Sequence, residues 1–323
     1  MKAAICTTYG PPEVLQFVEI AKPVPKDNEV LIKIKATTVA IADSRIRSFN
    51  VPSSVWIPAR IALGLRKPRK AVLGVELSGE IESVGKDVRR FKAGDHVFAA
   101  TLKNFGAYAE YKCLPEDDPI AIKPTNVTHE EAAALPIGAR TALHFLEKAN
   151  ITKGQKVLIY GASGSVGTYA VQLAHYFGAE VTGVCSSANI NLVKSLGADK
   201  VIDYTEPSFI EKLEMYDVVF VAIDKFPFAV CNKILNEKGV YLNVTNPIKS
   251  LRQLWVSLIS KKRIMMSENV PENADYLVRI KELVEKGILK PVVDKSYPFG
   301  QLREAHHYVD KGHKKGNVVI TMD

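Results

Sequence analysis

A glycine- and serine-rich turn near the middle of this 323-residue chain has the residue types that hold phosphates. The apolar run Val157 to Tyr160 predicts a strand, Gly161 to Gly167 predict a turn, and Thr168 to Ala174 predict a helix. A helix that begins at such a turn directs unpaired N–H groups and the positive end of its dipole toward bound anions. The segment therefore predicts a dinucleotide phosphate site.

The spacing inside the turn assigns a role to each small residue. Against the pattern G-x-G-x-x-G, Ala162 takes the first position, and Gly164 and Gly167 take the second and third. Gly164 would let the backbone approach a pyrophosphate, and Gly167 would let the helix pack closely on the strand. Ser163 and Ser165 could add hydroxyl donors, and Gly161 and Val166 complete the predicted contacts.

The end of the next predicted strand bears on which dinucleotide binds. Val181 to Val184 form that strand, and Cys185-Ser186-Ser187 follow it about 20 residues beyond the turn, where an NAD site would place an acid on the ribose hydroxyls. A carboxylate there would repel a 2′-phosphate, so two hydroxyls without an acid favour NADPH over NADH. No arginine is present either, and NADH stays an alternative.

The elements that position this turn alternate between strand and helix from Lys156 onward. Repeated β-α units of this length require parallel strands with right-handed crossovers, so the fold class is α/β with a doubly wound sheet. The predicted strands after the first are Val181–Val184, Val201–Ile202, Val218–Val221 and Val240–Val244.

The segments before and after this region have different sequence patterns. A capping-box pattern, Thr128-His129-Glu130-Glu131, opens an Ala-rich helix and predicts the start of the second domain, and a helix is expected near Ala274 to Lys286. The β-rich segments are Val30–Lys35, Leu73–Val84, His96–Ala99, Pro291–Val293 and Asn317–Ile320.

Composition limits the classes of function. The chain is 47% apolar and 24% charged, which is ordinary for a globular protein of two domains. The net charge is +8, with a basic stretch from Arg60 to Lys70, yet no reader motif predicts specific nucleic-acid binding. Neither a signal peptide nor a transmembrane segment is predicted, so we expect a cytoplasmic protein. The dispersed Cys6, Cys113, Cys185 and Cys231 predict reduced thiols.

Several motifs in order resemble the zinc-independent, zeta-crystallin-like quinone oxidoreductases of the medium-chain dehydrogenase/reductase superfamily. The resemblance covers essentially the whole chain. The motifs that carry it are Leu73 to Gly85, Phe91 to Val97, Gly106 to Tyr111, Ala132 to Pro136 and Lys315 to Val319.

The resemblance implies a GroES-like β-barrel domain, residues 1–122 plus 291–323, and a Rossmann domain, residues 123–290, with reaction in the cleft between them. It further implies that Thr141 lies near the nicotinamide and that Tyr204 lies beside the adenosine ribose or its phosphate. It implies a homodimer as well. The other residues that it implies along the cofactor cleft are Ala222, Ile223, Val244, Thr245, Asn246 and Asn317.

The chain departs from the family pattern in three places. Ala188-Asn189 stand where many relatives carry a cation for the 2′-phosphate, so Ser186, Ser187 and Asn189 are left to surround that group. An early motif keeps Asp43 but has Ala40 in place of an amide. The loop from Phe49 to Lys70 is long and basic, so access of the substrate can differ.

The resemblance also bears on the chemistry. Val75 stands where zinc alcohol dehydrogenases have a histidine ligand, and no cysteine cluster exists, so no metal is predicted. Hydride transfer without a Lewis acid suits acceptors that delocalise charge, which are quinones and α,β-unsaturated carbonyls. Asp43 is the tentative catalytic residue, although it could instead order its loop.

Two alternatives to this NADPH-dependent reductase stay open. One is a metal-free carbonyl reductase or alcohol dehydrogenase, and the other is a non-catalytic NADPH-binding sensor or interaction protein. The apolar stripe Leu251, Leu254, Trp255, Leu258 and Ile259 is expected to form a helix that covers the substrate cleft or a subunit interface, with membrane-surface binding as the alternative. His306 and His307 are expected in surface or capping roles.

Overall fold

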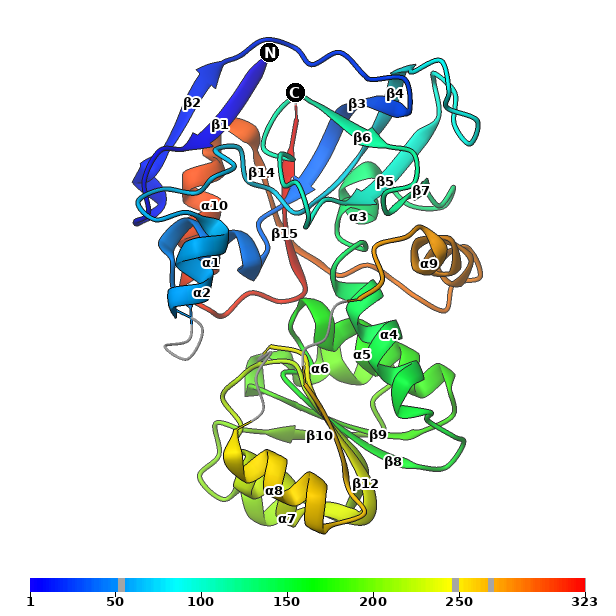
Figure 1. Ribbon diagram of the computed structural model, residues 1–323. Helices are drawn as coiled ribbons and strands as arrows, with labels where there is room; N and C mark the ends of the chain where they lie inside the picture. Colours follow the sequence, from blue (N-terminus) through cyan, green and yellow to red (C-terminus); the bar gives the residue numbers. More distant parts are fainter. Residues whose placement is uncertain (52–55, 246–249, 267–269, 323) are drawn as a thin grey trace. The chain divides into compact units, whose positions relative to one another are not determined.

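The computed structural model describes residues 1–51, 56–245, 250–266 and 270–322, and it divides into two compact units (Figure 1). Unit 1 comprises Met1–Ile137, Glu272–Glu285 and Pro291–Asp323, whereas unit 2 comprises Gly138–Pro271 and Lys286–Lys290.

Unit 2 contains the alternating strands and helices that the sequence predicts. Its elements are α4 (Gly138–Ala149), β8 (Lys156–Tyr160), α5 (Ser165–Tyr176), β9 (Glu180–Cys185), α6 (Ile190–Ser195), β10 (Lys200–Asp203), β11 (Tyr216–Val221), α7 (Phe228–Lys233), β12 (Leu235–Asn243), α8 (Leu251–Ile259) and β13 (Arg263–Met266).

The strands of unit 2 form one parallel six-stranded sheet in the order β10-β9-β8-β11-β12-β13. This is the doubly wound order, and it confirms the predicted fold class. The chain reverses its direction of winding between β8 and β11, so the carboxyl ends of these two strands mark the place where such sheets bind ligands. The glycine-rich turn follows β8 at this place.

The core of unit 2 explains why its strands are continuous apolar runs. A sheet covered by helices buries both of its faces, so inward and outward positions are both apolar. Leu158, Val184 and Val219 are fully buried in one cluster with Tyr241 and Ile264 from the outer strands. The rigid sheet therefore fixes the positions of the turns at its carboxyl edge.

Unit 1 is rich in strands. Its elements are β1 (Lys2–Cys6), β2 (Leu15–Glu19), β3 (Glu29–Thr38), α1 (Ile41–Ser48), α2 (Trp56–Leu63), β4 (Glu76–Val84), β5 (His96–Ala100), β6 (Tyr111–Pro115), β7 (Ile120–Ile122), α3 (His129–Ala133), α9 (Asp275–Glu285), β14 (Val293–Pro298), α10 (Leu302–Asp310) and β15 (Asn317–Thr321).

The main sheet of unit 1 has the order β14-β15-β3-β4-β5-β7, with β6 also paired to β3. The last strand, β15, pairs antiparallel with β3, where Val319 lies opposite Thr38. Strands from the two ends of the sequence therefore complete one sheet, as the resemblance implies. Buried clusters lie around Ile32 and Leu77 on one side and around Tyr108 and Val309 on another.

The division between the units differs from the predicted boundaries in two segments. Residues 123–137 and 272–285 were expected in the Rossmann domain, but they group with unit 1. Hydrogen bonds explain part of this grouping, because Thr125 N–H donates to Glu285 and Asn126 donates to the carbonyl of Val284. The Thr128 capping box forms as predicted, but α3 is short and ends at Ala133.

The predicted apolar stripe near residue 255 forms helix α8, which Ser250 caps through Gln253. Several of its large apolar side chains are exposed in the structure: Leu254 (43%), Trp255 (66%), Leu258 (82%) and Ile259 (70%).

Candidate functional site

The glycine-rich turn of unit 2 is held against the neighbouring strand. The N–H groups of Gly161 and Ala162 both donate to the carbonyl of Val184 at 3.0 Å, and Gly164 N–H donates to the carbonyl of Gly161 at 3.0 Å. Gly164 is the N-cap of α5 and has no side chain to cap it. The first-turn N–H groups of α5, which include Val166, therefore face the place where a phosphate can accept from them.

Three glycines make this turn possible, each for a different reason. Gly161 has φ +84°, a conformation that favours glycine, so it makes the tight turn in place of Ala162, to which the sequence pattern assigned the first position. A Cβ on Gly167 would lie 2.1 Å from the carbonyl oxygen of Gly161, which matches its predicted packing role. A Cβ on Gly164 would meet only that same oxygen, at 3.4 Å, and otherwise open space. A pyrophosphate contact at this space stays a prediction.

Asn189 joins the turn to the end of β9. Its Nδ2 donates to Ser163 Oγ at 3.1 Å and to Ser186 Oγ at 3.2 Å. The side chain is 8% exposed, and its Oδ1 has no hydrogen-bond partner among the described residues. A buried amide with an unused atom is costly, so a polar group of a ligand would stabilise it. The structure thus brings together three residues of the predicted cofactor set.

An acid lies near this cluster, although none ends β9. Asp203 ends the neighbouring strand β10 and lies opposite Cys185 in the sheet register. Although burial would raise its pKa, hydrogen bonds from Thr205 and Ser187 hold the pKa of this carboxyl below its usual range. Its Oδ1 accepts from Thr205 N and Oγ1 at 2.8 and 2.7 Å. Reasoning from β9 alone missed this ionised group, because it belongs to the next strand.

The predicted residues after β11 lie beside the turn. Ala222 N–H donates to the carbonyl of Tyr160 at 2.9 Å, and a Cβ on Gly161 would lie 2.8 Å from Ile223. After β12, Thr245 N and Oγ1 donate to Asn243 Oδ1 at 2.9 and 2.8 Å. Residues from two strand ends are therefore held by short local hydrogen bonds.

The remaining predicted residues of unit 2 have different settings. Tyr204 is 40% exposed, and its ring centroid lies 6.3 Å from that of Tyr160. Val244 follows β12 and donates to the carbonyl of Val221. Thr141 is partly buried on α4, and Asn246 lies outside the described residues.

In unit 1, Asp43 occupies a fully buried position at the start of α1. Its Oδ2 accepts from Ala40 N–H at 3.1 Å and its Oδ1 from Gly74 N–H at 3.0 Å. Burial raises the pKa of this carboxyl to about 7, the two backbone donors oppose the rise, and the charge of Glu76 adds to it. Because both oxygens bind backbone, Asp43 orders its loop in the structure, which was one of its two predicted roles.

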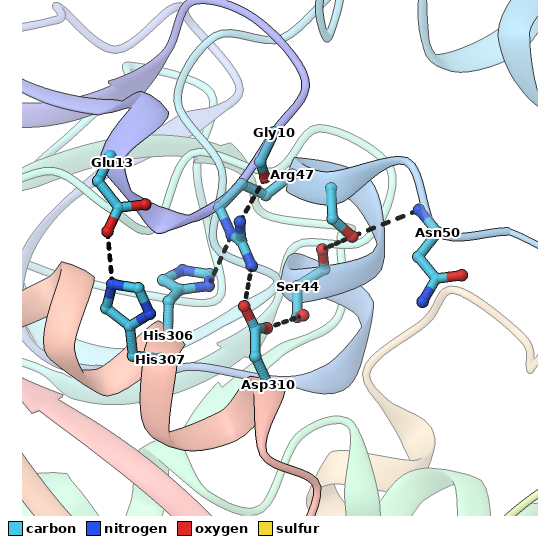
Figure 2. Close-up of polar contacts among 9 residues, drawn as sticks. Gly10, Glu13, Ser44, Arg47, Asn50, His306, His307 and Asp310 are labelled. Carbon is cyan, nitrogen blue, oxygen red and sulfur yellow. Dashed lines mark hydrogen bonds and ion pairs between the residues drawn. The ribbon is translucent and has the colours of Figure 1, made fainter.

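Helix α1 is also fastened by a buried arginine (Figure 2). Arg47 donates from Nη2 to Asp310 at 2.5 Å, from Nη1 to the carbonyl of Gly10 at 2.5 Å, and from Nε to His306 Nδ1 at 3.3 Å. His306 is fully buried, so the expectation of a surface or capping role is wrong. Burial lowers the pKa of His306 to about 3, and the charge of Arg47 adds to this effect. Of these two histidines, His307 is the exposed one, and it pairs with Glu13.

A buried glutamate and a lysine near the end of the chain were not singled out from the sequence. Glu76 accepts from Thr38 Oγ1 and from Ile137 N–H. Burial lowers the pKa of Lys314 to about 8, while the charges of Glu76 and Asp294 oppose the shift. Lys314 Nζ donates to the carbonyl of Gly316 at 2.5 Å. The predicted Asn317 is buried next in the chain and donates to the carbonyl of Val292.

Comparison with known families covers both ends of the chain. The family described as "Alcohol dehydrogenase GroES-like domain" matches residues 26–124, and the family described as "Zinc-binding dehydrogenase" matches residues 196–320. In addition, no helix within the described residues is long and apolar enough to cross a membrane.

Individual relatives extend over nearly the whole chain. A 2-methylene-furan-3-one reductase of Solanum lycopersicum is 33% identical, covering 99% of this chain and 79% of that protein. An NADPH-dependent alkenal/one oxidoreductase of Arabidopsis thaliana, chloroplastic by name, is 31% identical with coverage of 99% and 79%. A cytoplasmic location for this chain stays a prediction.

A solved structure agrees with these relatives. The quinone oxidoreductase from Coxiella burnetii superposes with a TM-score of 0.89 at 28% identity, covering 100% of this chain and 99% of that one. A GroES-like domain and a doubly wound Rossmann sheet occur together in this fold. With identities above 30% over nearly its full length, the chain belongs to the quinone and alkenal oxidoreductases of the medium-chain dehydrogenase/reductase superfamily.

Proposed function

We propose that this protein is an NADPH-dependent oxidoreductase that reduces a quinone or an α,β-unsaturated carbonyl. The observation that carries the proposal is the open space at Gly164, at the N-terminus of α5 and at the reversal point of a parallel sheet. The relatives named for alkenal/one and quinone reduction support the substrate class.

The chain's own residues would hold the cofactor from two sides. Gly161 to Gly167 would bind the pyrophosphate through backbone N–H groups, with Ser163 and Ser165 nearby. Ser186, Ser187, Asn189 and Tyr204 would surround the adenosine ribose.

Two features favour NADPH over NADH. The first is that no acid ends β9; the ionised Asp203 ends the neighbouring strand β10, where Thr205 and Ser187 bind its carboxylate. The second is that the side chain of Asn189 carries no charge, so it does not repel a 2′-phosphate. We expect kcat/KM to be higher with NADPH than with NADH, and the reverse order would contradict this part of the proposal.

The residues proposed to hold the nicotinamide are Thr141, Ala222, Ile223, Val244, Thr245, Asn246 and Asn317. A reduced nicotinamide, when bound, supplies a hydride. The protein contributes orientation and exclusion of water around the reacting atoms. Since both oxygens of Asp43 accept backbone N–H groups, we assign the completing proton to solvent.

We further propose that the reaction needs no zinc. Val75 is a fully buried apolar residue at the position where the resemblance expects a histidine ligand in zinc enzymes. All four cysteines are free, and three of them are buried. We expect turnover to survive dialysis against a chelator, and loss of turnover that added zinc restores would contradict the proposal.

A homodimer is also proposed. Strand β13 lies at one edge of the parallel sheet, and the nearby α8 exposes Trp255 and Leu258. A second copy of the chain would cover such an apolar surface. Light scattering of the purified protein tests this, and a dimer that Leu258→Glu leaves intact would exclude α8 from the interface.

The decisive experiment measures oxidation of NADPH at 340 nm with a panel of quinones and enones, beside simple ketones and aldehydes as controls. We expect turnover with conjugated acceptors and none with simple carbonyls, because only conjugated acceptors delocalise the incoming charge without a Lewis acid. Tight NADPH binding with no turnover across the panel would contradict the proposal.

A further inference from the structure

A second polar site lies wholly within unit 1, and none of the predicted cofactor residues belongs to it. It is a solvent-open hollow of about 550 Å³. Two lysines, two histidines and one glutamate contribute its titratable side chains: Lys35, Lys123, His96, His129 and Glu130. The hydroxyl residues Thr128 and Thr321 also line it.

The two histidines continue a hydrogen-bond chain that begins inside the protein. The hydroxyl of the buried Ser78 donates to the carbonyl of Val97 at 2.9 Å, so its oxygen must accept from His129 Nδ1–H at 2.8 Å. His129 Nε2 then carries no proton, and it accepts from His96 Nδ1–H at 3.1 Å. This assignment of tautomers fixes the orientation of both rings. The Nε2 atom of the exposed His96 is left for other partners.

The charges around the hollow favour an anion over a cation. Burial lowers the pKa of His129 to about 4, and the charges of Lys123, His96 and Lys35 lower it further while Glu130 opposes them. A metal ion between the rings would meet the same repulsion. Lys123 Nζ donates to the carbonyls of Pro124 and Val127, which holds it in place. One of its three protons remains for a ligand.

We propose that this hollow binds a tetrahedral dianion of the phosphate or sulfate class through Lys35, Lys123 and the protonated form of His96. His96 has to be protonated, since Nδ1–H already donates to His129 and a second donor toward the anion requires a proton on Nε2. With that proton in place, Lys35, Lys123 and His96 give the lining three positive charges against the carboxylate of Glu130, while Glu131 near Lys123 and Glu80 opposite His96 lie outside the lining. Binding of the anion and uptake of a proton are therefore linked.

Calorimetric titration with inorganic sulfate tests the proposal, because sulfate stays a dianion across the whole pH range and any pH dependence belongs to the protein. The protein is first saturated with NADPH, and ionic strength is held constant with chloride, so that sulfate does not enter the glycine-rich turn. We expect saturable binding that strengthens from pH 8 to pH 6, with proton uptake visible in buffers of different ionisation enthalpy.

Matched variants separate this site from general attraction to a basic protein. Lys35→Gln should weaken sulfate binding about tenfold, because it removes one charge-assisted contact. His96→Gln should weaken binding at pH 6 and abolish its pH dependence. Lys238→Gln removes one charge from exposed chain in unit 2 and should leave binding unchanged. Unsaturable binding, or equal binding by wild type, Lys35→Gln and His96→Gln with unchanged melting curves, would overturn the proposal.

Discussion

Gly164 and Gly167 are three residues apart, yet a methyl group at each would meet different surroundings. Gly164→Ala places its Cβ 3.4 Å from the nearest atom, so we expect the fold to lose about 1 kcal/mol at most, mainly from the weaker cap. The same methyl group occupies the space proposed for a phosphate, so the Kd for NADPH should rise at least about tenfold. Fluorescence titration of the cofactor measures this rise.

Gly167→Ala serves as the structural counterpart. Its Cβ would lie 2.1 Å from a backbone oxygen, so α5 has to move and the melting temperature should fall clearly. If the Gly164→Ala variant has the melting temperature of the wild type but binds NADPH poorly, the open space at residue 164 belongs to the cofactor site. If Gly164→Ala binds NADPH as wild type does, the phosphate is held elsewhere.

Asp43 predicts a dependence of stability on pH. Its pKa is raised from 3.8 to about 7 in the folded protein, so the folded state holds a proton that the unfolded state has released between about pH 4 and 7. Its contribution to stability is therefore present at pH 4 and lost as the pH rises through 7. Asp43→Asn has no carboxyl group to titrate, so its stability lacks this dependence on pH. The free energy of unfolding of the wild type should therefore approach that of Asp43→Asn as the pH rises from about 4 to 7. Urea unfolding at several pH values measures it, and a constant difference would show that Asp43 titrates normally.

Individual residues show where reasoning from the sequence reached the site and where it stopped. Gly167 and Asn189 could be placed because they lie in or just after a recognisable strand-turn-helix unit. Asp203 could not, since its proximity to Ser187 depends on the pairing of β10 with β9. The burial of Asp43 depends on Gly74, which lies 31 residues away in sequence.

At the scale of elements, the contacts that Arg47 of α1 makes with His306 and Asp310 of α10 give a stability prediction. Asp310→Asn leaves the buried guanidinium of Arg47 without its carboxylate, and we expect a loss of about 2–4 kcal/mol in the free energy of unfolding. Glu13→Gln, which breaks the exposed pair with His307, should change stability little, because water screens that pair. Equal effects of the two substitutions in urea unfolding would contradict a buried role for the Arg47 pair.

Helices and strands could be predicted where local signals are strong. The reciprocal hydrogen bonds of Thr128 and Glu131 form as the pattern predicts. The early end of α3 was not foreseen, because the Ala-rich run continues past Ala133 until Pro136 interrupts it. His306 was misplaced for a different reason: its partner Arg47 lies on another element, 259 residues away.

At the scale of the whole molecule, a cofactor that binds the turn should stabilise unit 2, which contains every proposed cofactor residue except Asn317, more than unit 1. The chain offers one tryptophan in each unit, Trp56 and Trp255, as separate reporters. Saturation with NADPH at about 100 times its Kd adds about 2.7 kcal/mol to the state that binds it. We therefore expect Trp56→Phe, which reports unit 2, to show a larger cofactor-induced rise in melting temperature than Trp255→Phe. Equal rises would mean that the units unfold together.

The order of the family motifs predicted the two-unit architecture better than the local hydrophobic periodicity did. Alternating strands and helices predict the parallel sheet of unit 2, since each crossover is local. The pairing of β15 with β3 joins the far ends of the sequence, and hydrophobic periodicity contains no information about it. Only the family resemblance supplied that expectation, and the grouping of residues 272–285 with unit 1 lay beyond it.

The pairing of β15 with β3 also determines when unit 1 can finish folding during synthesis. A ribosome makes β3 early and β15 only after all of unit 2 has been synthesised, so one edge of β3 lacks its partner near Thr38 while most of the inserted unit is already outside the ribosome. An unpaired strand edge is a template for association with other chains. The nascent protein therefore passes through a stage in which unit 2 is complete, while unit 1 still lacks β15 and is exposed to misassembly and open to chaperones.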